Sequence, residues 1–191
     1  MIEELSIEDT VLLSVEQLYD SSENIELIAE FEASEKGKGL EYYLKEAAEY
    51  DEKRNVARTY LVKDTVSREL VGYFSIRTGL ITIQVKDESF DSYPAIELSN
   101  FAVNVKYKKN HPEVEGLGKY IFRSFVVPIV KKISKYVGVN SLYIYALPND
   151  KLIEYYQKLG FTRLPEKHEK FVQQHVKPKY DEGCIFMFQN L

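Results

Sequence analysis

The chain has 191 residues, and 45% of them are hydrophobic, so its length fits one compact domain with a substantial core. No stretch approaches the roughly 20 apolar residues that a membrane-spanning helix needs, and the first ten residues are acidic, unlike an export leader. Its one cysteine, Cys184, excludes a disulfide framework. We therefore expect a soluble cytoplasmic protein without a membrane partner.

The net charge of −5 is unevenly distributed along the chain. Residues 1–54 carry 5 Lys and Arg against 16 Asp and Glu, which leaves the remainder with a net charge of +6. The second part therefore suits a polyanionic ligand, whereas the front end would repel one. An exposed acidic face is the simplest interpretation of the front end.

The N-terminal third reads mostly helical. A strand candidate at residues 11–13 comes first, and Ser21 can cap a helix that runs towards Phe31. A second helix, with an apolar stripe from Leu40 to Ala47, continues through Tyr50.

The middle of the chain changes to a β pattern. The runs 59–62 and 70–76, separated by a polar turn, predict an antiparallel hairpin. Another strand is expected at 80–85, and a polar loop ending in Tyr93 and Pro94 leads into a strongly apolar strand at 96–103.

The clearest helix follows Gly116-Leu117-Gly118. Apolar residues recur on one face from Ile121 to Val137, Pro128 predicts a kink and Gly138 is a plausible stop. The remaining expected elements are a strand at 141–146, a helix at 150–159 ended by Gly160, and a strand pair at 161–164 and 185–188. This pair brackets a Lys-rich insertion around Phe171, and Cys184 reads as a residue of the last strand. This order indicates an α/β layered fold with a mixed sheet.

The strongest chemical signal is the Gly-containing segment between Val103 and Lys119, because it opens a long helix. Backbone N–H groups at a helix N-terminus are unpaired and the helix dipole is positive there, so the segment suits a phosphate. Positive charge close by comes from Lys106, Lys108, Lys109 and Lys119. A tight turn explains the two glycines equally well, and no third glycine completes a dinucleotide fingerprint.

Together, Gly116-Leu117-Gly118 at the head of a long helix, the following strand and the segment from Asn149 to Phe161 resemble the GNAT N-acyltransferases. The resemblance extends from about Thr59 to the last strand. It implies an α/β (α+β) fold, with a GNAT-like mixed, mostly antiparallel central sheet flanked by helices. It also implies one acyl-CoA N-acyltransferase domain over residues 1–191, with a helical acceptor-side part at 1–55 and a sheet and cofactor-binding part at 56–191.

The same resemblance implies acetyl-CoA as the cofactor and assigns roles to individual residues. Tyr156 would protonate the departing thiolate, and Glu97 is either a general base or a surface residue at the strand end. The implied cofactor-binding residues are Phe101, Ala102, Val103, Glu115, Gly116, Leu117, Gly118, Lys119, Asn149 and Tyr156. No metal site is expected.

Two features depart from the family pattern. Glu113 stands where family members usually carry Gln or Arg, and Lys108 to Pro112 lengthen the connection after Tyr107. The lysines or His111 could compensate for Glu113, although His111 reads more simply as a solvated loop residue.

The first functional hypothesis is acetyl transfer from acetyl-CoA to a primary amine by direct attack, on a small molecule or a protein. Residues 40–47 and 58–62 are more weakly similar to GNAT toxins that acetylate aminoacyl-tRNA, a reading that the basic body permits and the acidic front end weakens. A third hypothesis is a non-catalytic acyl-CoA-binding or interaction domain, for which Glu113 argues. A homodimer is compatible with all three.

Overall fold

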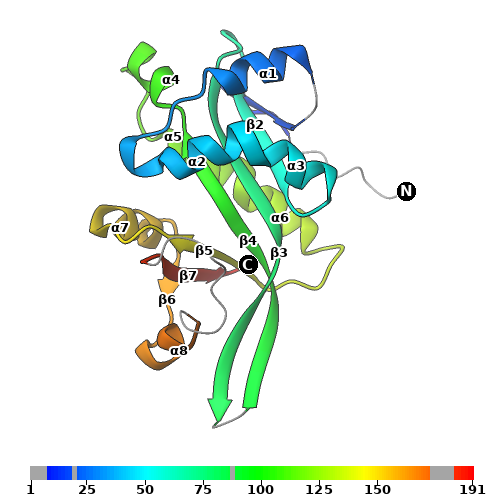
Figure 1. Cartoon of the computed structure of the whole chain (residues 1–191), viewed down its shortest axis with the longest axis vertical. Coiled ribbons are helices and arrows are strands. Elements are labelled where there is room, and N and C mark those ends of the chain that lie inside the picture. Colours follow the sequence, from blue (N-terminus) through cyan, green and yellow to red (C-terminus); the bar gives the residue numbers. More distant parts are fainter. Residues whose placement is uncertain (1–7, 19–20, 87–88, 173–182) are drawn as a thin grey trace. The chain divides into compact units, whose positions relative to one another are not determined.

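The computed structural model describes residues 8–18, 21–86, 89–172 and 183–191 (Figure 1). Its contacts divide the chain into two compact units. Unit 1 comprises Met1–Arg77 and Asn100–Lys132, and unit 2 comprises Thr78–Ser99 and Ile133–Leu191. In the described part of the chain, no helix is long and apolar enough to cross a membrane. The organisation as one domain stays a prediction.

The strands follow the order β1-β2-β3-β4-β5-β7-β6 in the described residues. Unit 1 contains β1 (Leu13–Gln17), β2 (Arg58–Asp64), the start of β3 (Leu70–Lys86) and the end of β4 (Ser89–Val103). Unit 2 contains the rest of β3 and β4 with β5 (Ser141–Ala146), β6 (Thr162–Arg163) and β7 (Ile185–Asn190). The β4–β5 pair is parallel, whereas β1–β2, β2–β3, β5–β7 and β6–β7 are antiparallel. The predicted mixed, mostly antiparallel sheet is therefore confirmed.

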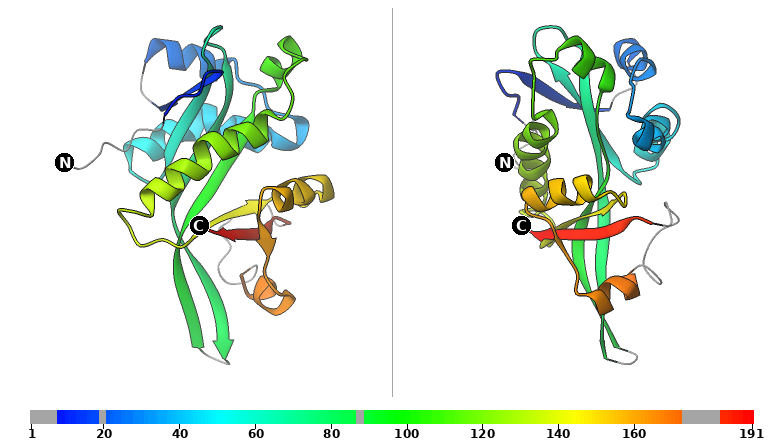
Figure 2. Two further views of the ribbon diagram at one scale, coloured as in Figure 1. Left: turned by 180° about the vertical axis from the view of Figure 1, so that it is seen from behind. Right: turned by 90° about the vertical axis from the view of Figure 1, so that its left-hand side faces the viewer.

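Helices cover both faces of the strands in unit 1, as the right-hand view of Figure 2 shows. On one side lie α1 (Ser22–Ala29), η1 (Glu35–Gly37), α2 (Lys38–Tyr42), η2 (Tyr43–Ala47) and α3 (Ala48–Lys53). On the other side, α5 (Leu117–Ile121), η3 (Phe122–Val126) and α6 (Val127–Ile133) form one continuous helix. The short helix α4 (Val105–Asn110) follows β4.

The core of unit 1 gathers around Tyr73. Its ring lies edge-on to Phe31 at 5.4 Å, and its hydroxyl donates to the carbonyl of Leu40 at 2.6 Å. The same cluster includes Leu18, Leu44, Ala48, Leu61 and Leu70. The predicted cap is present, because the Ser21 side chain accepts from the N–H of Asn24 at the start of α1. In the predicted apolar stripe of the second helix, Leu44 is buried in this cluster, and Leu40 and Tyr43 pack against it half-buried.

Both long helical segments of unit 1 contain a π-helical turn, η2 and η3. The second turn stands directly before Val127 and Pro128. Proline has no N–H, so the preceding turn cannot keep every regular helical hydrogen bond. The wider turn takes up this defect, and the helix continues through Pro128 to Ile133.

Unit 2 adds α7 (Asp150–Lys158) and α8 (Glu166–Phe171) to its strands. Its core cluster consists of Ile81, Ala95, Tyr143, Leu164, Val172 and Phe186. The strand at 141–146, the helix from Asp150 and the antiparallel pairing of β6 with β7 agree with the sequence prediction. Gly160 adopts a φ of 100° just after α7, which explains why the helix ends there.

Several boundaries differ from expectation. The first strand begins at Leu13, because Val11 and Leu12 are exposed rather than packed. The expected strand at 80–85 is part of β3, and the expected polar loop before Pro94 is part of β4. The long helix ends at Ile133, which leaves Val137 exposed beyond it.

Two predictions concern the C-terminal insertion. Cys184 is buried but lies one residue before β7 rather than within it. The insertion around Phe171 begins as α8, and its continuation at 173–182 lies outside the described residues.

Candidate functional site

The loop that the sequence singles out forms an exposed helix N-terminus in unit 1. Gly116 caps α5 in a left-handed conformation, with φ 67° and ψ 15°, which an L-residue with a side chain adopts only with strain. Glu115, Gly116 and Lys119 are exposed, whereas the Leu117 side chain is buried. The N–H of Tyr120 makes the first bond of the helix, to the carbonyl of Gly116 at 3.0 Å. The three N–H groups before Tyr120 thus have no partner within the helix, which suits an anion.

The end of β4 lies beside the start of β3 in the same unit, where Phe101, Ala102 and Val103 are half-buried. A Cβ added to Gly72 would come within 2.6 Å of the Ala102 carbonyl oxygen, so the close approach of the strands requires glycine. Asn104 then ends the strand: its Oδ1 accepts from the N–H of Lys106, and its Nδ2 donates to the Leu70 carbonyl at 2.8 Å. The implied cofactor strand is therefore fixed at its C-terminal end.

Two of the lysines expected near the phosphate loop have other partners. Lys106 Nζ lies 2.8 Å from Glu30, and Lys109 Nζ lies 3.3 Å from Glu32. Both pairs join α4 to the acidic front end within unit 1, and both are exposed, so each contributes little to stability. The sequence could not show this because α4 was not expected. Lys119, another of the predicted cationic residues, lies within the first turn of α5.

His111 lies partly exposed in the loop after α4, as the sequence suggested, but its ring is engaged with other residues. Its Nε2 lies 2.7 Å from Glu69 Oε2, and its ring stacks on Tyr107 at 4.3 Å. The hydrogen bond to Glu69 raises the pKa of His111 above its ordinary value and lowers the pKa of Glu69. Glu113 lies on the other side of the ring, 3.7 Å from Nδ1. His111 therefore joins the loop before Gly116 to the turn between β2 and β3.

Glu97 lies in unit 2, in the middle of β4 rather than at a strand end. Only 3% of it is exposed, so its interpretation as a surface residue is wrong. Its Oε2 accepts a hydrogen bond of 2.9 Å from the hydroxyl of Tyr143, its register partner on β5. Sequence reasoning missed Tyr143, because nothing in the pattern of β5 distinguishes it from the neighbouring Tyr145.

Tyr156 and Asn149 share α7 in unit 2. Tyr156 is buried, with its ring edge-on to Tyr155 at 5.4 Å and to Phe161 at 5.6 Å. Burial raises the pKa of Tyr156 above its ordinary value and raises the pKa of Tyr155 to about 12. Asn149 caps the helix, since its Oδ1 accepts from the N–H of Leu152 at 3.2 Å. Its side-chain N–H groups are not used by this cap.

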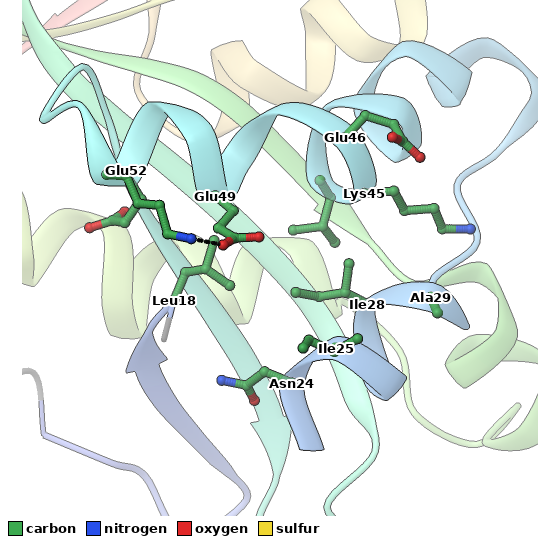
Figure 3. A pocket seen from close by; sticks show the side chains of 11 residues that line it. Leu18, Asn24, Ile25, Ile28, Ala29, Lys45, Glu46, Glu49 and Glu52 are labelled. Atoms are coloured by element: carbon green, nitrogen blue, oxygen red, sulfur yellow. Dashed lines mark hydrogen bonds and ion pairs between the residues drawn. The ribbon is translucent and has the colours of Figure 1, made fainter. Parts of the chain in front are cut away.

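A cavity of about 490 Å³ lies in unit 1 between α1 and the segment from η2 to α3 (Figure 3). Apolar side chains, including Leu18, Ile28 and Leu44, line its inner part, and charged residues of η2 and α3 surround it. Glu52 is already engaged, because it accepts from Gln17 and from the N–H of Thr59. The cavity falls in the region predicted as the acceptor side, although no pattern in the sequence indicates a cavity there.

The residues of the predicted site thus fall into two groups. Phe101 to Val103 and Glu115 to Lys119 belong to unit 1, whereas Glu97, Asn149 and Tyr156 belong to unit 2. In the described residues, no group of three or more His, Cys, Asp or Glu side chains could hold a metal ion.

No model of a known protein family matches the sequence, and no curated protein matches it either. Solved structures do resemble it. A tyrosine-to-phenylalanine mutant of the toxin AtaT is 18% identical, covers 98% of this chain and 95% of its own, and superposes with a TM-score of 0.68. A mutant of KacT is 20% identical, with coverages of 94% and 95% and a TM-score of 0.67. AtaT complexed with acetyl-methionyl-tRNA is 17% identical, with coverages of 91% and 93% and a TM-score of 0.62.

These neighbours are toxins with the GNAT fold. The chain has a GNAT fold. The architecture that the resemblance implied is therefore confirmed, including its similarity to the toxin subgroup. At these identities the GNAT fold alone is shared, and the chemistry has to be argued from this chain's own residues.

Proposed function

We propose that the chain is an acetyl-CoA-dependent N-acetyltransferase that transfers the acetyl group to a primary amine by direct attack. The observation that carries the proposal is the exposed N-terminus of α5 in a GNAT fold, formed by Gly116 in a left-handed conformation. Such an end binds diphosphate through main-chain N–H groups and the helix dipole. AtaT, a neighbour in fold, has been solved with acetyl-CoA.

In this proposal the donor is bound mainly by main-chain groups. The N–H groups of Leu117, Gly118 and Lys119 bind the pyrophosphate, with Glu115 and Gly116 forming the turn that presents them. The main chain of Phe101, Ala102 and Val103 binds the pantetheine arm, and the side-chain amide of Asn149 donates to it. Lys119 adds a positive charge near the pyrophosphate, which offsets the negative charge of Glu113.

The transfer itself needs two proton movements. A free alkylamine has a pKa near ~10.4, so the attacking nitrogen has to lose a proton, which Glu97 accepts directly or through water. A main-chain N–H near Val103 stabilises the oxyanion as the nitrogen attacks the thioester carbonyl. The thiolate then leaves and takes a proton from the phenol of Tyr156, which is protonated at neutral pH as an ordinary tyrosine is.

A second candidate acceptor is the amino group of an aminoacyl-tRNA. It is favoured by the neighbour AtaT, which has been solved in complex with acetyl-methionyl-tRNA. AtaT has also been solved with its antitoxin AtaR, so a toxin-type function would predict a protein partner for this chain. Binding of tRNA would weaken steeply with salt, because each phosphate contact releases counterions.

One experiment separates these functions from a non-catalytic acyl-CoA-binding domain. Acetyl-CoA is titrated calorimetrically into the wild type, into Lys119→Glu and into Lys135→Glu, an exposed control beyond the far end of the same helix. We expect Lys119→Glu to weaken binding roughly tenfold or more and the control to stay within about twofold. Absence of binding to the wild type would refute the proposal.

Thiol release is then followed with a panel of small amines, peptides and aminoacyl-tRNA. Turnover with one class identifies the acceptor. Binding of acetyl-CoA without turnover by any class identifies a binding domain, and the catalytic part of the proposal is then wrong.

A further inference from the structure

His111 lies between two carboxylates, one on the turn before β3 and one on the loop before Gly116. The Nε2 atom of His111 lies 2.7 Å from Glu69 Oε2, and its Nδ1 atom lies 3.7 Å from Glu113 Oε1. The side-chain N–H of Asn110 donates to the other oxygen of Glu69 at 3.3 Å. All of these residues belong to unit 1, as does the start of α5.

The helix α4 holds His111 in this position. Its ring stacks on Tyr107 at 4.3 Å, and the Tyr107 hydroxyl donates to Asp64 Oδ2 at 2.7 Å. The N–H of His111 donates to the Tyr107 carbonyl at 2.9 Å, and its carbonyl accepts from the N–H of Val114 at 3.1 Å. Ring and main chain of His111 are therefore both fixed, and with them the first part of the loop that leads to Gly116.

Three carboxylates act on the His111 ring. Asp64 and Glu69 do so from the end of β2 and the turn after it, and Glu113 does so from the ring's own loop. The remaining titratable neighbour is the neutral phenol of Tyr107. The hydrogen bond to Glu69 raises the pKa of His111 above its ordinary value, so the charged ring persists to higher pH than in a free histidine.

Protonation decides whether the ring can hold Glu69 and Glu113 together. An imidazolium carries an N–H on each ring nitrogen and a positive charge, so it attracts both carboxylates. A neutral imidazole has one N–H. When that N–H is on Nε2 and donates to Glu69, the lone pair of Nδ1 faces Glu113 and repels it. Loss of the proton therefore releases Glu113 first.

The charge of Glu113 matters because it precedes the proposed phosphate site. A free carboxylate there would repel a pyrophosphate bound to the amides of Leu117 to Lys119. The imidazolium charge of His111 opposes this repulsion, in addition to the charge of Lys119. A neutral ring does not, so the two protonation states of His111 differ in their effect on a bound anion.

We propose that His111 is a positioning residue for acetyl-CoA binding: its protonated ring fixes the loop before Gly116 and neutralises Glu113, so the affinity for acetyl-CoA falls as the ring loses its proton. This role rests on the proposed function. Because linkage is reciprocal, bound acetyl-CoA in turn favours the protonated ring. Donor binding thereby responds to pH near neutrality, where histidine titrates.

The test measures the Kd for acetyl-CoA by calorimetry from pH 6 to pH 9 in the full chain. Wild type is compared with His111→Gln, which keeps a donor without a charge, and with Glu113→Gln. His168→Gln is the matched control, because His168 lies on α8 in unit 2. Variants are compared with wild type at each pH, since the ligand's own phosphate, with a pKa near ~6, titrates in all of them.

At pH 6, His111→Gln should bind acetyl-CoA about three- to fivefold more weakly than wild type, as expected for a partly exposed ion pair. This difference should shrink as the pH rises and the wild-type ring loses its proton, to less than about twofold at pH 9. Glu113→Gln should match wild type at pH 6 and bind about three- to fivefold more tightly at pH 9. His168→Gln should match wild type throughout.

A second readout needs no acetyl-CoA. An NMR titration of the His111 ring should give a lower pKa in Glu113→Gln than in wild type, because one of the attracting carboxylates is gone. An unchanged pKa would overturn the pairing of His111 with Glu113. The Glu113 side chain is 69% exposed, so this variant keeps the test decisive even if His111→Gln does not fold.

A ratio of Kd between His111→Gln and wild type that stays constant from pH 6 to pH 9 would show only a structural contribution. That result overturns the role of His111 and leaves the proposed function intact. A wild type that binds no acetyl-CoA at any pH refutes the proposed function, and the role of His111 fails with it. The two failures are therefore distinguishable.

Discussion

Replacement of Tyr156 by Phe tests the proposed chemistry most directly, because it removes the hydroxyl and keeps the ring that packs in the core. The ring lies edge-on to Tyr155 and Phe161, and Phe keeps both contacts. We therefore expect the free energy of unfolding to change by less than about 1 kcal/mol.

The expected loss is in turnover. General acids contribute about 100- to 10,000-fold, and a thiolate, with a conjugate-acid pKa near ~8.5, is a leaving group that needs the smaller contribution. We expect kcat to fall about 100-fold, or about 2.7 kcal/mol of activation free energy, while the Kd for acetyl-CoA changes less than about twofold.

The assay is thiol release at saturating acetyl-CoA, supported by single-turnover measurements that show chemistry to limit the rate. Tyr155→Phe is the matched control on the same helix. The Tyr155 hydroxyl is buried and makes no hydrogen bond to any described residue, so its removal should leave kcat unchanged and stability equal or higher. Wild-type kcat in Tyr156→Phe, with chemistry limiting, would remove Tyr156 from the mechanism.

Three further predictions concern unit 1. Lys63 is 2% exposed and donates to Asn24 Oδ1 at 2.8 Å, so Lys63→Met should lower the free energy of unfolding by about 1–3 kcal/mol in urea denaturation. An unchanged midpoint would contradict a stabilising role for this buried lysine. His111→Ala should destabilise in a pH-dependent way: the raised pKa of His111 gives stability that is fully present below about pH 6.5 and is lost as the pH rises through the folded-state pKa. Because the pKa of Glu69 is lowered, the destabilisation by His111→Ala should also shrink in acid, where Glu69 becomes protonated. A difference in melting temperature between variant and wild type that is constant from pH 4 to 9 would refute a contribution of the His111–Glu69 pair. Gly72→Ala should destabilise by about 1–3 kcal/mol, since the new Cβ would meet the main chain of β4, and thermal melting at wild-type temperature would contradict this.

The sequence best predicted the elements in which the apolar periodicity agrees with the glycine or turn residues at the ends of the element. The helix after Gly116 and the strand at 141–146 combine a clear apolar pattern with a glycine or a turn at the boundary. The fold followed from a resemblance carried by two segments together, the helix start at Gly116-Leu117-Gly118 and the segment from Asn149 to Phe161. Their burial in the structure confirms that the periodicity reflected packing.

Elements with few buried side chains escaped prediction. Residues 89–94 of β4 are exposed and include Pro94, so they read as a loop, although pairing with β3 keeps them extended. The helix α4 carries lysines that serve ion pairs with Glu30 and Glu32, and such pairs join residues more than 70 positions apart. Nothing local in the sequence encodes them.

The candidate site was predicted unevenly for the same reason. The exposed turn at Gly116 follows from a local rule about glycine and helix ends. The burial of Glu97 and its bond to Tyr143, 46 residues further along the chain, depend on the register of two strands. Register is set by the whole sheet, so this part of the site could be found only in three dimensions.

The π-helical turn η3 sets the rotational phase of the helix that begins at Gly116. A π-helical turn is equivalent to one residue inserted into a regular helix, which rotates everything before it by about 100° relative to everything after it. Leu117 and Ile121 on one side of the turn and Ile129 and Val130 on the other are all buried, which shows that the inserted residue is compensated by the apolar pattern. Deletion of one residue within Phe122–Val126 would give a more regular helix. If Ile129 and Val130 stayed packed, however, the first turn of the helix would be rotated about the helix axis. Its free amide groups would then point in a different direction.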